Sequence, residues 1–205
     1  MLKKTVVIID YGIGNIFSVK QAFDQIGADT IITSESKVIE NAKYLVLPGV
    51  GAFSKAMRSL DGLNLVSSII SAANRGVPLL GICLGMQLLL DHSMENNVNC
   101  LSIIEGRCKA FSQQDKHPVP HMGWNNVNFN KPSPLTEDLD NDDYFYFVHS
   151  YYTQVDDSQY IAATCEYGFE FCVSLAKDNI FATQFHPEKS GAAGLALIKN
   201  WVSAL

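Results

Sequence analysis

Hydrophobic and polar positions alternate in two different ways along this chain. In the first half, short β-branched runs are separated by stretches with helical spacing, such as Ile16, Val19, Phe23 and Ile26, with Gly27 as a stop. This rhythm is typical of helices that cross over between parallel strands. The strands that it predicts are Thr5–Asp10, Asp29–Thr33, Tyr44–Leu47 and Pro78–Cys83.

The second half has shorter apolar runs separated by Asn, Asp, Pro and Gly turns, which favours mixed or antiparallel pairing. The strands predicted there are Val127–Phe129, Tyr144–His149, Ile161–Cys165, Val173–Ala176 and Phe181–Phe185. A closing helix is predicted from an apolar stripe at Leu195, Ile198, Trp201, Val202 and Leu205. We therefore expect one α/β domain over residues 1–205, with an open sheet that is parallel first and mixed or antiparallel later, and helices on both faces.

Composition narrows the classes of function. The net charge is -6 without a basic cluster, which argues against a nucleic-acid partner. Five cysteines without a C-x-x-C pair fit neither a disulfide framework nor a zinc site, so we expect reduced thiols in the cytoplasm and no metal. The longest apolar stretch, residues 79–90, is too short to span a membrane, and the one at the start is too short for a signal peptide. No strand-linked G-x-G-x-x-G or Walker loop indicates a cofactor.

Cys83 carries the strongest chemical signal, in the run G-I-C-L-G where a predicted strand meets an apolar helical run. Small residues on both sides of a nucleophile permit the sharp strand-to-helix turn seen in G-x-S-x-G hydrolases. At a helix N-terminus the thiol would be activated toward the thiolate. An isolated cysteine is more often a buried core residue, and we interpret the other four in that way.

His186 is the best-placed base for such a thiol, because it directly follows the predicted strand Phe181–Phe185. Glu188 comes two residues later, and an extended or turn conformation at Pro187 would let its carboxylate orient the imidazole. Cys83, His186 and Glu188 thus form a candidate catalytic triad. Taken alone, His186 is equally well explained as a surface loop residue.

A third element is the run P-G-V-G-A-F over residues 48–53, after the strand Tyr44–Leu47. Its paired glycines free backbone N–H groups at the carboxyl edge of the sheet, where α/β proteins place their sites. Such groups can bind an oxyanion. The commoner meaning of G-x-G is a simple tight turn.

Taken together, these motifs resemble the class I glutamine amidotransferases, and within them the glutaminase subunits of imidazole glycerol phosphate synthases. The resemblance runs nearly end to end. The runs that carry it are D-Y-G-I-G-N (10–15), P-G-V-G-A-F (48–53), G-I-C-L-G-M-Q (81–87), P-H-M-G-W-N (120–125), V-H-S-Y (148–151) and Q-F-H-P-E-K-S (184–190).

The resemblance implies a role for each of these runs. Cys83 would attack the side-chain amide of L-glutamine, His186 would transfer the proton and Glu188 would orient His186. Gln87 and Glu95 would bind the α-amino and carboxylate ends of the substrate. The Val50 N–H would bind the oxyanion after a reorientation that an occupied partner induces. The other residues implied in substrate binding are Gly49, Gly51, Leu84, His149, Ser150 and Tyr151.

A glutaminase of 205 residues leaves no room for an ammonia-consuming domain, so we expect the acceptor site on another chain. The resemblance implies a (β/α)8 barrel cyclase in a heterodimer, which uses the ammonia to make imidazole glycerol phosphate and AICAR in histidine biosynthesis. The residues expected at that interface are Asn15, Pro120, His121, Met122, Gly123, Trp124, Asn125 and Lys189. For Met122 and Trp124 the alternative is ordinary packing.

Three other interpretations remain open at this point. A paralogue with the same triad would supply ammonia for amidino-sugar formation in surface-polysaccharide biosynthesis. A non-catalytic subunit would only bind a partner, although such copies usually lose the nucleophile or the base. A stand-alone cysteine hydrolase or redox chaperone would not need the runs at 120–125 and 184–190 together.

Overall fold

The computed structural model describes residues 4–112, 117–130 and 134–204. Its main sheet begins with four parallel strands in the order β2-β1-β3-β4. Their bounds are β1 (Thr5–Ile9), β2 (Asp29–Thr33), β3 (Leu45–Gly49) and β4 (Leu79–Cys83). This confirms the parallel first half and places each predicted strand to within two residues.

Beyond β4 the pairing becomes mixed. β14 (Ile180–Thr183) lies parallel to β4, and β13 (Glu170–Lys177) returns antiparallel to β14. The remaining strands of the main sheet are β5 (His92–Ser93), β6 (Val98–Asn99), β7 (Gly106–Ala110), β9 (Asn128–Phe129), β11 (Tyr151–Val155) and β12 (Ile161–Glu166). A separate antiparallel pair joins β8 (His121–Asn126) to β10 (Tyr144–His149). The prediction of a mixed second half is confirmed.

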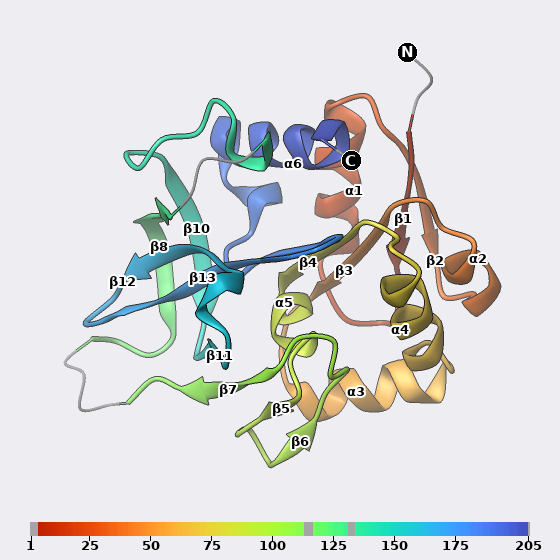
Figure 1. Cartoon of the computed structure of the whole chain (residues 1–205), viewed down its shortest axis with the longest axis horizontal. Coiled ribbons are helices and arrows are strands. Elements are labelled where there is room, and N and C mark those ends of the chain that lie inside the picture. Colours follow the sequence, from red (N-terminus) through yellow and green to blue (C-terminus); the bar gives the residue numbers. More distant parts are fainter. Residues whose placement is uncertain (1–3, 113–116, 131–133, 205) are drawn as a thin grey trace.

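Helices cover both faces of the parallel strands (Figure 1). In β1, Val6 and Ile8 join one buried cluster while Val7 and Ile9 join the other, because successive side chains point to opposite faces. α1 (Ile16–Gln25) and α6 (Gly191–Ala204) lie side by side on the first face. The helices on the second face are α2 (Ser36–Glu40), α3 (Phe53–Gly62), α4 (Val66–Asn74) and α5 (Leu84–Leu88).

The predicted closing helix is confirmed as α6. Leu197, Ile198 and Trp201 are its buried apolar residues, and Leu195 and Val202 pack against the same cluster. Leu205 lies outside the described residues. The 3-10 turns within the described part of the chain are η2 (Pro134–Thr136), η3 (Ser158–Tyr160) and η4 (Pro187–Lys189).

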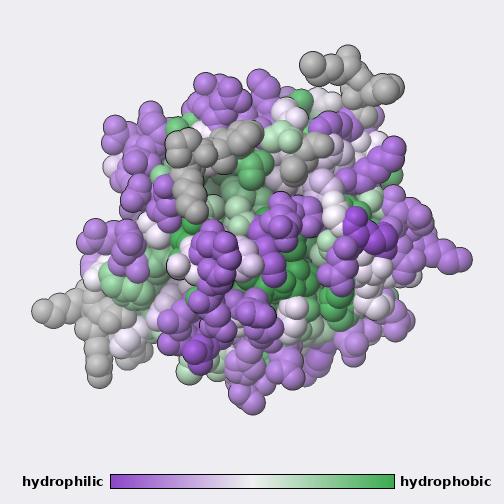
Figure 2. Space-filling model, in the orientation of Figure 1, coloured by the Kyte–Doolittle hydropathy of each residue, from purple (hydrophilic) through white to green (hydrophobic). Residues whose placement is uncertain are grey.

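The surface seen in Figure 2 is mostly polar, with apolar side chains showing near its centre over α4 and α5. No helix among the described residues is long and apolar enough to cross a membrane.

Candidate active site

Cys83 ends β4 and precedes α5, so its backbone makes the turn between a buried strand and a helix. Its φ is +56°, a left-handed conformation that is rare outside glycine and costs roughly 1–3 kcal/mol. The side chain is buried, so the packed surroundings hold this conformation. A strained turn of this kind presents a nucleophile at the carboxyl edge of the sheet.

Two glycines allow the backbone to pack closely around this turn. A Cβ on Gly85 would lie 1.8 Å from the carbonyl oxygen of Leu47, and a Cβ on Gly81 would lie 3.0 Å from the backbone of Met86. A side chain at Gly85 would push β3 away from the turn. The glycine bracket around Cys83 therefore has a steric cause.

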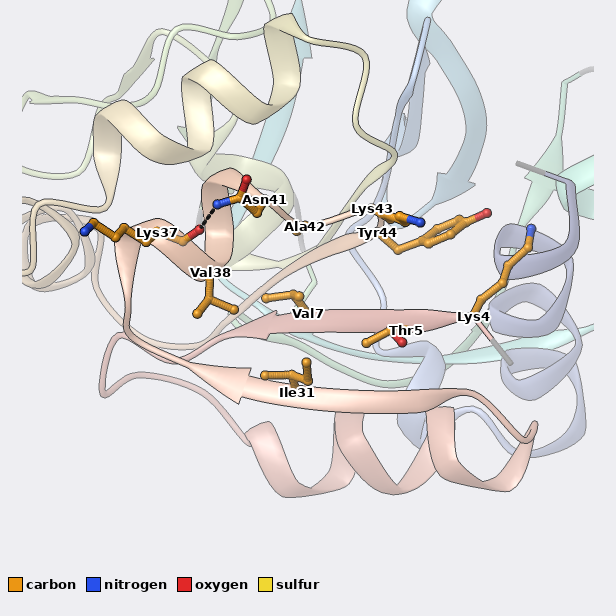
Figure 3. A pocket seen from close by; sticks show the side chains of 10 residues that line it. All are labelled: Lys4, Thr5, Val7, Ile31, Lys37, Val38, Asn41, Ala42, Lys43 and Tyr44. Carbon is orange, nitrogen blue, oxygen red and sulfur yellow. Dashed lines mark hydrogen bonds between the residues drawn. The ribbon is translucent and has the colours of Figure 1, made fainter. Parts of the chain in front are cut away.

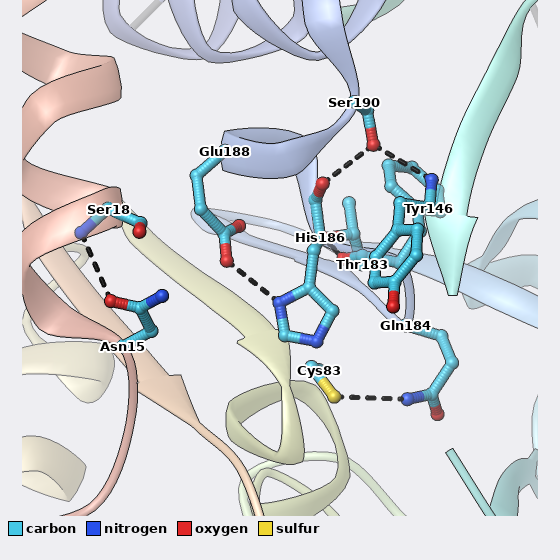
Figure 4. Close-up of polar contacts among 10 residues, drawn as sticks. Asn15, Ser18, Cys83, Tyr146, Thr183, Gln184, His186, Glu188 and Ser190 are labelled. Carbon is cyan, nitrogen blue, oxygen red and sulfur yellow. Dashed lines mark hydrogen bonds and ion pairs between the residues drawn. The ribbon is translucent and has the colours of Figure 1, made fainter. Parts of the chain in front are cut away.

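His186 and Glu188 reach Cys83 from the neighbouring strand. Because β14 runs parallel to β4, the chain leaves it at the same edge of the sheet. Pro187 then begins the 3-10 turn η4, which folds Glu188 back onto the histidine. Glu188 Oε1 lies 2.8 Å from His186 Nδ1, and both side chains are 2% exposed. Figure 4 shows the other ring nitrogen, Nε2, pointing toward Cys83.

His186 has an unusual electrostatic environment. Burial lowers the pKa of its imidazole, but interactions with Cys83 and then with Glu188 outweigh burial and raise the pKa to about 10. The ring is therefore an imidazolium near neutral pH. Nε2 is buried and points toward the sulfur of Cys83, the residue that raises the pKa of the ring most.

Ser190 and Tyr146 hold the backbone of His186 in place (Figure 4). Ser190 Oγ donates to the His186 carbonyl oxygen at 2.6 Å and accepts from the Tyr146 N–H at 3.0 Å. The His186 N–H donates to the Tyr146 carbonyl oxygen at 2.9 Å. Sequence reasoning assigned no role to these residues, because Tyr146 is 44 residues away from Ser190 along the chain.

A cavity of about 340 Å³ opens beside Cys83, which is enough for a small polar substrate. Eight of the nine residues predicted to bind substrate line it, namely Val50, Gly51, Leu84, Gln87, Glu95, His149, Ser150 and Tyr151. The ninth, Gly49, lies behind this lining in β3, where it is paired with Cys83. Phe53, Pro120 and Val148 also line the cavity. The sequence analysis placed Pro120 at the interface and gave Phe53 and Val148 no individual role.

Two glutamine side chains connect the floor of this cavity to the sulfur. Gln87 Nε2 donates to the Tyr151 carbonyl oxygen at 2.8 Å and to Gln184 Oε1 at 2.7 Å. Gln184 Nε2 lies 3.8 Å from Cys83 Sγ. Gln184 is fully buried and sits next to the histidine loop in sequence, but its contact with the sulfur depends on folding alone.

Glu95 and Tyr151 form another side of the cavity. Glu95 Oε2 accepts from the Phe53 N–H at 2.7 Å, and the Tyr151 ring packs edge-on against Phe53 at 5.6 Å. Burial and the charge of Glu95 raise the pKa of Tyr151. A carboxylate in this position suits the ammonium group of an amino acid.

Two more buried histidines lie on the β8–β10 pair, where His149 and His121 are register partners. His121 Nδ1 lies 2.9 Å from His149 Nε2, and His149 Nδ1 lies 2.8 Å from the Tyr151 carbonyl oxygen. Burial lowers the pKa of His149 to about 3 and that of His121 to about 4. Both rings are therefore neutral near pH 7.

The residues predicted at an interface divide between the two sides of β8. Met122 and Trp124 are 62% and 56% exposed on its outer side. His121 is only 3% exposed, so its side chain does not belong to the exposed face on which we expected it. Gly123 and Asn125 are half-buried on the same inward side as His121.

The other predicted interface residues are exposed. Asn15 caps α1 by accepting from the Ser18 N–H at 3.4 Å, and Lys189 lies over the Tyr146 ring at 5.8 Å. Pro120 is exposed as well. Sequence reasoning missed Phe17, which is 80% exposed on α1, because a single apolar residue outside the helical stripe carries no pattern.

A larger groove of about 840 Å³ lies between α2 and the β1–β2 edge of the sheet (Figure 3). Lys4, Lys37 and Lys43 line it together with Tyr44 and with aliphatic and small polar residues. Among the described residues that line it there is no cysteine, histidine or carboxylate. Size alone therefore does not identify the reactive site.

The remaining cysteines lack an activating environment. Burial raises the pKa of Cys100, Cys165 and Cys172 to about 12, and it also raises the pKa of Cys108. All five thiols are free. Across residues 4–112, 117–130 and 134–204, no three His, Cys, Asp or Glu side chains form a group suited to a metal ion.

Comparison with known proteins gives a consistent result. A family model described as "Glutamine amidotransferase class-I" matches residues 7–204. Two curated relatives are both called "Imidazole glycerol phosphate synthase subunit HisH". The one from Methanothermobacter thermautotrophicus is 47% identical and the match covers 98% of each chain; the one from Geobacter sulfurreducens is 45% identical, over 96% of this chain and 97% of the relative.

Solved structures share the fold at low sequence identity. The structure of PurLQS from Thermotoga maritima superposes with a TM-score of 0.78 at 16% identity, covering 99% of each chain. A glutamine amidotransferase from Thermotoga maritima gives a TM-score of 0.66 at 16% identity, covering 100% of this chain and 83% of the other. These two comparisons establish the fold alone, and they confirm the predicted α/β fold class.

Proposed function

The chain belongs to the class I glutamine amidotransferase family, and from this premise we propose that it is the glutaminase subunit of an imidazole glycerol phosphate synthase. It hydrolyses L-glutamine to glutamate and ammonia, and the ammonia serves histidine biosynthesis. The observation that carries the proposal is the contact of a buried Glu188–His186 pair with a strained cysteine beside a cavity.

The first half of the reaction joins the acyl group of the substrate to Cys83. Cys83 Sγ attacks the side-chain amide carbon of glutamine, and the carbonyl oxygen becomes an oxyanion that the Val50 N–H binds. His186 Nε2 then gives its proton to the amide nitrogen. The C–N bond breaks, ammonia leaves and a glutamyl thioester remains on Cys83.

The second half returns the enzyme to its starting state. The neutral His186 takes a proton from a water molecule, which attacks the thioester carbon and releases glutamate from Cys83. Glu188 keeps Nδ1 protonated throughout, so that Nε2 always faces the reacting atoms. One water is consumed for each glutamine, and no cofactor or metal takes part.

The cavity lining supports the recognition of an amino acid. Glu95 offers a carboxylate to the substrate ammonium, and Gln87, whose Nε2 donates to Tyr151 and Gln184, has its Oε1 left as an acceptor in the cavity lining. The volume of about 340 Å³ suits a molecule of the size of glutamine.

The reaction takes place in the cytoplasm, where the five free thiols stay reduced.

The exposed face of β8 is the proposed contact with a (β/α)8 barrel cyclase subunit. Met122 and Trp124 present two large apolar side chains to solvent, which is a costly arrangement for a free surface and a common one at an interface. Asn15, which caps the N-terminus of α1, and Lys189, which ends η4, extend the proposed contact with polar groups. This heterodimer passes ammonia to the cyclase, which makes imidazole glycerol phosphate and AICAR.

The test is glutamate release by the purified chain, alone and mixed with a histidine-pathway barrel cyclase, with and without the ribonucleotide substrate of that cyclase. We expect strong stimulation by the loaded cyclase. A matched pair of variants separates docking from folding. Trp124→Ala changes the exposed face proposed for docking, whereas Trp201→Ala changes a residue buried in the core. Absence of glutamate release under every condition would overturn the proposal.

A further inference from the structure

A continuous series of hydrogen bonds runs from β8 to the sulfur of Cys83, which we call the relay. Its outer end is Asn125, whose Nδ2 lies 3.3 Å from His121 Nε2. Its members in order are Asn125, His121, His149, the Tyr151 carbonyl, Gln87, Gln184 and Cys83. All the side chains between its two ends are buried.

The direction of donation in the relay follows from its partners. A carbonyl oxygen only accepts, so His149 Nδ1 carries the proton that it donates to Tyr151. A neutral His149 then has a bare Nε2, which accepts from the Nδ1–H of His121. His121 Nε2 is left as an acceptor, and Asn125 Nδ2 supplies the donor.

The hydrogen bonds of Asn125, at the outer end of the relay, support the same assignment of donors and acceptors. Its Oδ1 accepts from the Asn126 N–H at 2.9 Å, and its Nδ2 also donates to the Glu166 carbonyl oxygen at 3.0 Å. The amide group is therefore fixed with Nδ2 toward His121. Both ends of the relay select the same tautomer for His121.

The two rings have little freedom to change this arrangement. His121 stacks between Phe147 and Tyr167, with ring centroids 4.6 Å and 4.0 Å away. Phe111 packs against both histidines, at 6.5 Å from His121 and 5.3 Å from His149. This aromatic enclosure replaces water, so His149 Nε2 depends on His121 for its partner.

We propose that His121 is a positioning residue for the glutamine site. Through His149 it holds the Tyr151 carbonyl, which in turn orients the amides of Gln87 and Gln184 toward the cavity and Cys83. This inference rests on the proposed glutaminase function. Without the Nδ1–H of His121, His149 Nε2 is a buried acceptor without a donor, and the ring relaxes by releasing Tyr151.

The experiment measures covalent labelling of Cys83 by a diazoketone analogue of glutamine as a function of its concentration. His121→Phe keeps a ring but removes the donor, and we expect the half-saturating concentration to rise about tenfold. His121→Asn places an amide donor near the position of Nδ1, and we expect it to stay within about threefold of the wild type. Alkylation of Cys83 by iodoacetamide, which carries no amino-acid group for the cavity to bind, should be unchanged in both variants.

His117→Phe is the matched control. His117 packs on the same Tyr167 ring at 4.9 Å and is not a member of the relay, so we expect wild-type labelling. Wild-type labelling of His121→Phe would overturn the proposal, as would an equal loss in His121→Asn, since packing alone would then explain the effect.

A second variant decides the matter if His121→Phe does not fold. Asn125→Leu, at the half-buried end of the relay, removes the donor to His121 Nε2 that fixes the tautomer and adds no charge beside the ring. We expect a rise of at least threefold in the half-saturating concentration, and an unchanged value would overturn the proposal. If the wild-type chain is not labelled at all, the proposed function itself fails, which is a different result from labelling that ignores His121.

Discussion

Two clusters of buried side chains near the cavity of Cys83 contain histidines, one in the first and two in the second, and they differ in what faces the rings. In one, His186 meets the carboxylate of Glu188 and the sulfur of Cys83, and its pKa rises to about 10. In the other, His121 and His149 meet each other and a backbone carbonyl, and their pKa values fall to about 4 and about 3.

Burial acts in the same direction on all three rings, because it disfavours the charged imidazolium. The difference comes from the partners, since Cys83 and then the Glu188 carboxylate, 2.8 Å away, outweigh the effect of burial on His186, whereas the neighbouring His121 adds to the effect of burial on His149. Histidine thus serves as a charged proton donor in the first cluster and as a pair of neutral hydrogen-bonded rings in the second. The following changes test this contrast, beginning with the largest effect.

Removing the sulfur that both clusters serve should have the largest effect. Cys83→Ala is expected to abolish glutamate release, because none of the other four thiols lies beside the His186–Glu188 pair. Ammonia-dependent synthesis by the cyclase partner should continue, and Cys172→Ala should leave glutamate release intact. Loss of ammonia-dependent synthesis in Cys83→Ala would indicate a structural role for Cys83 instead.

Removing the charged histidine should reduce turnover nearly as much. His186→Asn is expected to lower the rate of glutamate release by roughly 10³-fold or more, because the leaving ammonia no longer receives a proton. His92→Asn, a change at a partly exposed histidine outside the site, serves as the control. Retained turnover in His186→Asn would remove this residue from the triad.

Glu188→Gln should make the first cluster resemble the second. Without the carboxylate, the pKa of His186 falls from about 10 toward its ordinary value, and the rate is expected to drop about 10²-fold. The imidazolium is then lost at a lower pH, so the alkaline limit of activity moves downward. A pH profile of glutamate release that keeps its alkaline limit would contradict this account.

The neutral cluster should be visible in the pH dependence of stability. The folded pKa values of His121 and His149 lie below the unfolded value of about 6.5. Between pH 6.5 and pH 4 the unfolded chain therefore binds more protons than the folded chain does. The free energy of unfolding should therefore decrease over this range by up to about 1.4 kcal/mol per pH unit for each ring. Urea unfolding of the wild type and of His121→Asn measures the difference in slope, and equal slopes would exclude a neutral His121.

The sequence predicted the parts of the fold that rest on local pattern. β1 to β4, α1, β10 and α6 have strong apolar periodicity, and all of them are confirmed. The strands β7, β8 and β11 were missed, because Gly106–Ala110 and His121–Asn126 are polar runs that become strands only through pairing with distant partners. The predicted strand Phe181–Phe185 begins one residue late and ends two residues beyond Thr183, since the Thr183 hydroxyl bonds to the Phe185 carbonyl and turns the chain toward the site.

The residues of the candidate site also differ in whether local sequence pattern or distant partners determine their positions. Cys83, His186 and Glu188 lie in compact motifs, and the structure brings them together. Ser190 and Gln184 belong to one of these motifs, but their partners lie far away in sequence, so their contacts were not foreseen. The burial of His121 follows from strand alternation in β8, a strand that the sequence pattern did not indicate.

The most direct test of the central claim is peptide mapping by mass spectrometry after treatment of the chain with the diazoketone analogue of glutamine. The account predicts a single adduct on Cys83, formed more slowly in the presence of glutamine, with Cys100, Cys108, Cys165 and Cys172 unmodified. Labelling spread over several cysteines, or labelling that glutamine does not slow, would contradict the assignment of Cys83 as the nucleophile of a glutaminase.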